Sequence, residues 1–300
     1  MRSFLLLYPP TLTLHLGKAF GIFWAIFQLG AFIGSVIALA INIRSGSLSA
    51  VATGTYVAFL IIILIGIASA FLVLGPHRIV REDGSLVKLR AKTSVSEEVK
   101  GIIAVFQDWR MLALVPMCFA SNYFYSYQGA VNAHVFDGPT RALNATLEGA
   151  GAIVGALIIG FGVLDDNKLW HAKRRTRGYV GLAVVTALTI IIWSVALAWQ
   201  VTFTRADLTD DNKINYHNAN YRGKGALYFF FYFGDACYQA LAYWIMSALT
   251  NDPFTLARFA GFYKAIQSAG AAGSFGMDAV NTPFLNEHVS SSFSHPISRM

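Results

Sequence analysis

Apolar residues gather along the chain in long runs, instead of the short alternating patterns that half-buried strands and surface helices show. Each run is about 20 residues or longer, which is the length that an α-helix needs to cross the hydrocarbon core of a bilayer. Seven runs qualify: Phe20–Ile43, Gly54–Leu74, Met111–Asn132, Leu143–Leu164, Tyr179–Trp199, Gly225–Leu249 and Leu256–Val280. The pattern predicts an all-α fold, a polytopic transmembrane helix bundle with about seven spans.

The composition also supports a membrane protein. Of the 300 residues, 55% are hydrophobic and 13% are charged, and the mean hydropathy is +0.52. A soluble chain carries about a quarter charged residues. A soluble protein of this size would have no way to bury so much apolar surface, so we expect the lipid bilayer to act as the solvent. The composition indicates a multi-pass membrane location without indicating which membrane.

The basic residues, which give a net charge of +7, lie between the apolar runs. Seven lysines and arginines fall in residues 75–110 and five more in residues 165–178, whereas the remaining connections are poorer in them. The positive-inside rule places these two segments in the cytoplasm. The amino terminus is then cytoplasmic and the carboxy terminus is outside. The charge is therefore a topology signal, and we expect no nucleic-acid partner.

One basic segment has an internal pattern of its own. Residues Ser94–Trp109 alternate apolar and charged positions at helical spacing, which predicts an amphipathic helix leading into the third span. Two readings stay open. The helix lies along the membrane surface, or it is a solvated linker helix.

Polar residues are expensive inside a membrane, so their distribution is informative. The second and fifth spans have no charged or amide side chain until the end of the fifth, so both can face lipid all round. The other five spans should face a protein interior or an aqueous cavity. Their polar residues are Gln28, Asn122, Gln128, Glu148, Asp235, Gln239, Lys264, Gln267 and Asp278.

Spacing groups some of these residues. Asp235 and Gln239 are four apart and share a helix face, and Asp235 and Lys264 each lie about 15 Å in from opposite ends of their spans. A charge-compensating Asp235–Lys264 ion pair near the midplane is the resulting hypothesis. Simple helix packing and a ligand or ion cavity remain equally open, and Glu148 is either part of the cavity or protonated and silent. The candidate cavity and ion-pair residues are Asp235, Gln239, Lys264, Gln267, Asp278 and Glu148.

Small residues at helical spacing predict close contacts between helices. The candidates are the GxxxG pairs Gly30 and Gly34, Gly151 and Gly155, together with Gly270 and Gly273 in a dense small-residue patch. A glycosylation sequon begins at Asn144, at the outer end of the fourth span. We expect its closeness to the membrane to prevent glycosylation.

Motifs of catalysis do not stand out. The sequence has no Walker A loop or dinucleotide fingerprint, and its histidines and two cysteines do not show metal-ligand spacing. No Ser/His/Asp arrangement is evident. We therefore expect no enzyme activity, no cofactor and no metal site.

Two adjacent segments resemble a known family. Residues 233–252 (FGDACYQALAYWIMSALTND) and 256–272 (LARFAGFYKAIQSAGAA) are similar to a signature of the fungal unc-ninety-three-like (uncoordinated) proteins, the ion channel regulatory protein branch of the major facilitator superfamily. Weaker similarity at 17–30 and 140–144 extends the resemblance over about residues 8–280.

The resemblance implies a division of the chain. The superfamily fold has twelve helices in two bundles around a central cavity, and this chain corresponds to helices five to eleven, truncated at both ends. Residues 1–80 would hold the last two helices of the amino-terminal bundle and 81–110 a cytoplasmic linker with the amphipathic helix. Residues 111–280 would form a carboxy-terminal bundle of five spans, and 281–300 a polar tail that supplies no twelfth helix. The second and fifth spans would match the peripheral sixth and ninth helices.

The resemblance leaves three functions to weigh. The first is a transporter-like protein that moves a small molecule of unknown identity by rocking of two bundles. The second is a non-transporting accessory protein that regulates a channel or another membrane protein, or that serves a secondary-metabolite cluster. The third is an inactive truncated product.

Overall fold

The structure, a computed structural model, describes residues 16–45, 53–72, 94–166, 171–207 and 212–294. Its α-helices are α1 (Leu16–Ser45), α2 (Thr53–Ala70), α3 (Val95–Gln107), α4 (Trp109–Ala113), α5 (Val115–Ala120), α6 (Tyr125–Val135), α7 (Gly138–Ile159), α8 (Arg174–Gln200), α9 (Arg222–Leu249), α10 (Pro253–Ala279) and α11 (Phe284–Ser294). Of the basic residues behind the topology prediction, Arg78, Arg81, Lys88, Arg90, Lys92 and Lys168 lie outside the described residues.

The prediction of an all-α, polytopic helix bundle is confirmed. Three stretches of the described chain are long and apolar enough to cross a membrane by length and composition: Leu16–Ile43, Gly138–Leu164 and Arg174–Gln200. Helices α9 and α10, of 28 and 27 residues, are as long but more polar, and α2 is a shorter apolar helix of 18 residues. The number of seven crossings stays a prediction.

The third predicted span, Met111–Asn132, is not one helix. It divides into α4, α5 and α6, and the turn Ser121–Phe124 interrupts it midway. Pro116 lies in the first turn of α5, where a proline needs no hydrogen bond from its nitrogen. Hydropathy averages over such a break, because aromatic residues on both sides keep the run apolar. The break becomes tolerable in a membrane when neighbouring side chains satisfy the freed polar groups.

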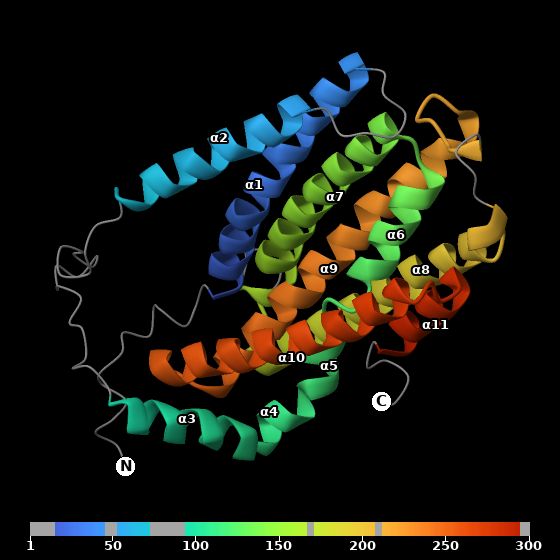
Figure 1. The fold of residues 1–300 in the computed structure, drawn as a ribbon. Coiled ribbons are helices and arrows are strands. Elements are labelled where there is room, and N and C mark those ends of the chain that lie inside the picture. Colours follow the sequence, from blue (N-terminus) through green and yellow to red (C-terminus); the bar gives the residue numbers. More distant parts are fainter. Residues whose placement is uncertain (1–15, 46–52, 73–93, 167–170, 208–211, 295–300) are drawn as a thin grey trace, which may run out of the picture.

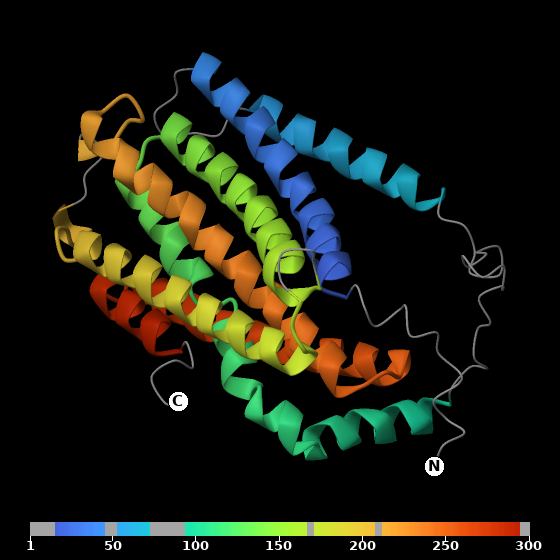
Figure 2. The same ribbon diagram turned by 180° about the vertical axis from the view of Figure 1, so that it is seen from behind.

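Helix α7 lies between α1 and α9 and forms the most extensive helix contacts of the bundle (Figures 1 and 2). Two glycines allow the approach to α9. A Cβ atom at Gly151 would collide with the carbonyl oxygen of Phe229, and one at Gly155 with that of Phe233. Both predicted packing glycines therefore lie at a backbone-to-backbone contact.

The other candidate glycines differ among themselves. A Cβ at Gly270 would collide with the backbone of Phe119 in α5, and one at Gly34 would lie 3.2 Å from the ring of Phe59 in α2. Gly273 would make only an ordinary contact, and within the described part of the chain no heavy atom of another segment lies within 4 Å of a Cβ at Gly30. The described residues therefore give no contact that supports the packing role predicted for Gly30.

The carboxy-terminal end of α7 is fastened to the start of α1. A π-helical turn, Gly160–Leu164, extends α7 and ends at Asp165. The Asp165 carboxylate accepts a hydrogen bond at 3.2 Å from the backbone amide of Lys18, in the first turn of α1, and lies 3.8 Å from the guanidinium of Arg177. A carboxylate at a helix amino terminus satisfies an otherwise unpaired amide and complements the helix dipole.

The two helices expected to face lipid behave differently. The described side chains of α2 are exposed almost throughout, and α2 packs against α1. Helix α8 instead buries one face, including Val185, Thr189, Ile192 and Trp193. The all-round lipid exposure that the composition allows is therefore not realised in α8, because aromatic and small residues pack into the protein as readily as they face lipid.

Helix α3 forms where the amphipathic pattern predicted it. Ser94 and Glu97 make reciprocal hydrogen bonds of a capping box, which starts the helix. Glu98 and Arg258 of α10 then form two hydrogen bonds of 3.0 Å each. After the helix, hydrogen bonds from Arg110 hold the pKa of Asp108 below its ordinary value.

One side of α3 and of the start of α4 exposes apolar residues. These are Val95, Val99, Ile102, Phe106 and Trp109, spaced three or four apart, and Phe106 also packs edge to face on Phe262 of α10. An exposed apolar stripe on a helix next to membrane spans favours the membrane-surface reading over the solvated linker.

The segment expected as a polar tail contains helix α11. Phe284, Glu287, His288 and Ser291 fall on one helix face and are nearly fully buried against α8, α6, α10 and α5. Arg205, in the loop after α8, holds this helix by a 2.7 Å ion pair with Glu287. The segment expected as a tail therefore contains a packed helix, which hydropathy does not reveal because polar residues outnumber apolar ones in this short helix.

Candidate functional site

A buried carboxylate stands at the middle of α9. Asp235 is 4% exposed and accepts a hydrogen bond of 2.7 Å from the hydroxyl of Tyr125 in α6. The side-chain amide of Gln239, one turn along α9, donates to both carboxylate oxygens at 2.9 and 3.0 Å. Tyr125 also stacks on Tyr232 of α9, with ring centroids 5.5 Å apart. The shared face expected for Asp235 and Gln239 is thus a direct contact.

Gln267 of α10 extends this network to the helix break. Its Nε2 lies 2.6 Å from Ser121 Oγ, 2.9 Å from Asn122 Oδ1 and 3.3 Å from Gln239 Oε1. The hydroxyl of Tyr263 completes the cluster, 2.5 Å from Ser121 Oγ. An amide nitrogen has two hydrogens, so Gln267 chooses between these acceptors. The network therefore joins α9, α10 and the α5–α6 break through side chains that have alternative partners.

Lys264 lies at the outer end of the same network. Its ammonium donates to Gln267 Oε1 at 2.8 Å and lies 5.7 Å from the ring centroid of Trp24 in α1. The expected direct ion pair between Asp235 and Lys264 is not formed. The two glutamine amides stand between the charges, because the Lys264 side chain turns toward α1 on the exposed side of α10.

Asp278 does not belong to this group. It forms a 2.5 Å ion pair with Arg205, the residue that also binds Glu287. Both contacts lie at the far end of α10, beside the start of α11. Four helical turns separate Asp278 from Lys264, and only their position in the same predicted span suggested a common site. Asp278, which was predicted to line the cavity, instead forms an ion pair with Arg205 away from Asp235.

Glu148 and Asn144 occupy α7. Glu148 interacts electrostatically with Tyr228 and Tyr232, and no hydrogen bond to it is found among the described residues. Its role stays a prediction. Asn144 is fully buried, donates to Asn132 Oδ1 at 2.8 Å and accepts from Tyr221 at 2.8 Å. A glycan on this side chain would not fit the folded structure, and the absence of glycosylation at Asn144 stays a prediction.

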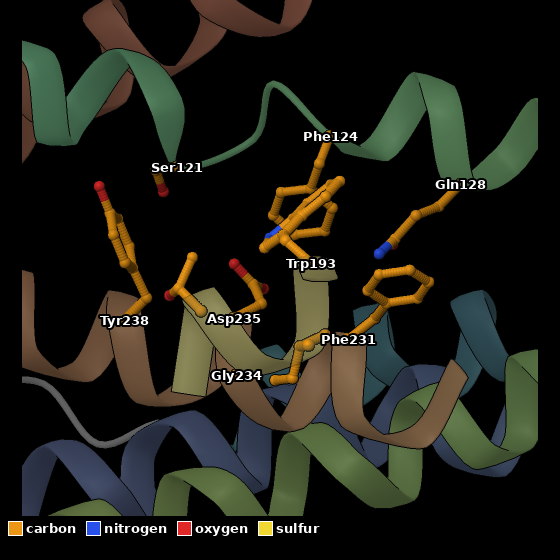
Figure 3. Close-up of a pocket in the computed structure, with 10 residues that line it drawn as sticks. Ser121, Phe124, Gln128, Trp193, Phe231, Gly234, Asp235 and Tyr238 are labelled. Atoms are coloured by element: carbon orange, nitrogen blue, oxygen red, sulfur yellow. The ribbon is translucent and has the colours of Figure 1, made fainter. Parts of the chain in front are cut away.

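A small cavity of about 20 Å³ adjoins Asp235, and Lys264 is not among the residues that line it. Figure 3 shows Asp235 and Gln128 directed into the space between α9, α8 and the α5–α6 break. Ser121, Thr189 and Trp193 also line it. Gln128 is 2% exposed, and neither its amide nitrogen nor its amide oxygen has a hydrogen-bond partner within the described part of the chain. Such a volume accommodates about one water molecule or one ion of similar size.

Several of these residues escaped the sequence analysis. Tyr125, Tyr263, Ser121 and Thr189 carry hydroxyl groups that are common in membrane helices, and only the folded arrangement brings them to the carboxylate. A run of tyrosines beside Asn122 was the available signal, because tyrosine hydroxyls inside a bilayer need partners.

Comparison with known proteins gives a consistent set of relatives. The chain is 36% identical to an UNC93-like protein of Schizosaccharomyces pombe. The alignment covers 88% of this chain and 52% of the yeast protein. The chain is 33% identical to UNC93-like protein 1 of Arabidopsis thaliana over 93% of its length and 60% of that protein. A more distant relative is a notoamide biosynthesis cluster protein of Aspergillus versicolor. It is 23% identical, and the alignment covers 87% of this chain and 55% of that protein.

These relatives are longer than this chain, which spans about half of the lengths of the curated proteins it matches. No family model matches the chain, and no solved structure matches it. The assignment of its spans to helices five to eleven of a major facilitator fold therefore stays a prediction.

Proposed function

Because the chain belongs to the UNC93-like family of membrane proteins, we propose that it is a transporter-like protein whose polar centre at the α5–α6 break handles a small solute or ion. One observation carries the proposal. The Asp235 carboxylate is buried midway along a membrane helix, held by Tyr125 and Gln239, and has no ion-pair partner among the described residues. Ionisable residues in such positions mark ion and substrate pathways.

The surroundings of Asp235 support the same proposal. Discontinuous helices in membrane transporters supply polar groups where irregular backbone lines a cavity, and the break at Ser121–Phe124 adjoins Asp235 in this way. The chain of amides through Gln239 and Gln267 leads from the carboxylate to Lys264 at the exposed side of α10. Alternative hydrogen-bond partners let such a chain rearrange without leaving polar groups unpaired.

The test is flux through reconstituted protein. The full chain is purified, placed in liposomes loaded with a pH-sensitive or a sodium-sensitive dye, and exposed to proton or sodium gradients. Flux that depends on the protein, falls at least about tenfold in Asp235→Asn and persists in Asp207→Asn, an exposed carboxylate, supports transport. Folded wild-type protein that moves neither ion contradicts it for these ions.

A second candidate is a non-transporting accessory role, and the size of the cavity favours it. A volume of about 20 Å³ admits a water molecule or an ion, whereas sites for metabolites occupy several hundred Å³. One relative is named for a metabolite biosynthesis cluster, so an accessory function in such a cluster is one form of this role. Stoichiometric co-purification with one membrane protein from the native membrane, together with absent flux, would favour it.

A further inference from the structure

The cavity beside Asp235 combines features that call for an occupant. A buried ionised carboxylate costs many kcal/mol unless a positive charge or several donors compensate it. Asp235 receives hydrogen bonds from Tyr125 and Gln239, which use part of the roughly four acceptor positions of its two oxygens. The remaining acceptor capacity borders the cavity that Asp235 lines.

Gln128 provides the second, independent observation. Its side-chain amide is directed into the same cavity from α6, is almost fully buried and has no protein partner among the described residues (Figure 3). A buried polar group without a partner costs about 1–3 kcal/mol. Because neither amide atom is engaged, rotation of the amide by half a turn presents the oxygen to the cavity without loss of a hydrogen bond.

The remaining walls suit a cation. Ser121 and Thr189 contribute hydroxyl oxygens, and the aromatic residues Phe124, Trp193 and Phe231 surround the space. Oxygen ligands from a carboxylate, an amide and hydroxyls are typical of hard cations, and aromatic faces attract cations. We propose that this cavity, lined by Asp235, Gln128, Ser121 and Thr189, binds a single dehydrated monovalent cation of the size of Na⁺.

Charge and volume select this class of ion. One carboxylate balances one positive charge, whereas a divalent ion would leave an excess charge in the membrane interior. The cavity of about 20 Å³ has room for an ion the size of a water molecule, and not for a hydrated ion. The described residues hold no group of three His, Cys, Asp or Glu side chains that would suit a transition metal. The proposal does not require that the ion crosses the membrane.

The experiment measures ion-dependent stability and binding in the full chain, purified in detergent. Thermal unfolding is followed in NaCl, KCl or N-methylglucamine chloride at equal ionic strength. We expect Na⁺ to raise the Tm by about 3 °C or more over N-methylglucamine, since an ion that binds only the folded state stabilises it. Radioactive Na⁺ binding should be saturable with about one ion per chain. Equal Tm values in all three salts, with no saturable binding, would overturn the proposal in favour of a water molecule beside a protonated Asp235.

Three variants make the result specific. Asp235→Asn should abolish the Na⁺-dependent rise in Tm, and Thr189→Val, which keeps the side-chain volume, should weaken Na⁺ binding about tenfold. The matched control is Gln200→Leu. Gln200 is buried like Asp235, but it accepts a hydrogen bond from Tyr127 and does not line the cavity. This control should lower the Tm in every salt and leave the Na⁺-dependent increment unchanged. If Asp235→Asn keeps that increment, the site lies elsewhere and the proposal is wrong.

Discussion

The Asp165 carboxylate accepts a hydrogen bond from the backbone amide of Lys18 at 3.2 Å, although the two residues are 147 positions apart in sequence. Asp165 ends the α7 segment and Lys18 lies in the first turn of α1, so one side chain fixes the carboxy-terminal end of α7 to the amino-terminal end of α1. Arg177, in the first turn of α8, lies 3.8 Å from the same carboxylate and is 8% exposed. Three membrane helices thus meet at a single buried acid.

Removal of this acid should destabilise the bundle. In Asp165→Ala, α1 loses its amino-terminal cap, which costs about 1 kcal/mol, and Arg177 keeps a buried charge without its nearest acid, which costs about 2 kcal/mol more. The Tm in detergent, measured by tryptophan fluorescence, should fall by several degrees. The control is Asp166→Ala at the neighbouring, more exposed carboxylate. Equal Tm values for the two variants would show that the contact with α1 carries little stability.

The contact between α7 and α9 predicts a steric effect. Gly151→Ala places a methyl group against the carbonyl oxygen of Phe229 and forces the helix backbones apart. Overpacking of this kind costs about 1–3 kcal/mol, so the fraction of monodisperse protein in size-exclusion chromatography should drop. Gly30→Ala is the matched control, because among the described residues no heavy atom outside its own helix lies within 4 Å of the added methyl. Comparable losses in both variants would contradict the close contact.

Arg205 is predicted to hold α11 on the bundle. Its guanidinium pairs with Glu287 and Asp278 and lies 3.9 Å from the ring centroid of Phe284. In Arg205→Gln, Glu287 would be left buried without its cation, so α11 should detach more often. A cysteine introduced at the buried Ser291 reports this, because maleimide labelling should accelerate at least about tenfold. Arg222→Gln, at an exposed arginine, should leave the labelling rate unchanged, and equal rates in the two variants would exclude the clamp.

The apolar stripe of α3 is predicted to contact lipid. The native Cys118 and Cys237 are buried, so a fluorophore attached to Val99→Cys or to Lys100→Cys reports these positions alone. Nitroxide-labelled lipids should quench the probe at 99 several times more strongly than the probe at 100, because the two residues lie on different sides of the helix. Equal quenching would instead support a solvated helix.

The sequence predicted the elements better than their breaks and partners. Runs of apolar residues located α1, α7, α8, α9 and α10, because length and hydropathy govern membrane helices. The same averages concealed the turn at Ser121–Phe124 and the burial of α11, since both depend on side chains that satisfy polar groups from distant segments. Local pattern cannot supply such partners.

In the polar site too, the sequence predicted a contact within one helix and missed the contacts between helices. The i, i+4 spacing predicted the contact of Asp235 with Gln239. It could not predict the side chains that come from other helices, above all Tyr125 and Gln128. The direct pairing with Lys264 failed because equal depth in the membrane does not fix the direction in which a side chain turns around its helix. Depth is a one-dimensional coordinate, whereas contact requires the rotation of both helices.

The π-helical turn at Gly160–Leu164 sets the direction in which Asp165 points. Such a turn holds one residue more than a regular helical turn. If the same residues were wound as a regular α-helix, Asp165 would be rotated by about 100° around the axis, away from the amide of Lys18. The wide turn absorbs the additional residue, so that Asp165 faces nearly the direction that it would have in a regular helix one residue shorter. The junction of α7 with α1 therefore depends on the width of one helical turn as well as on the carboxylate itself.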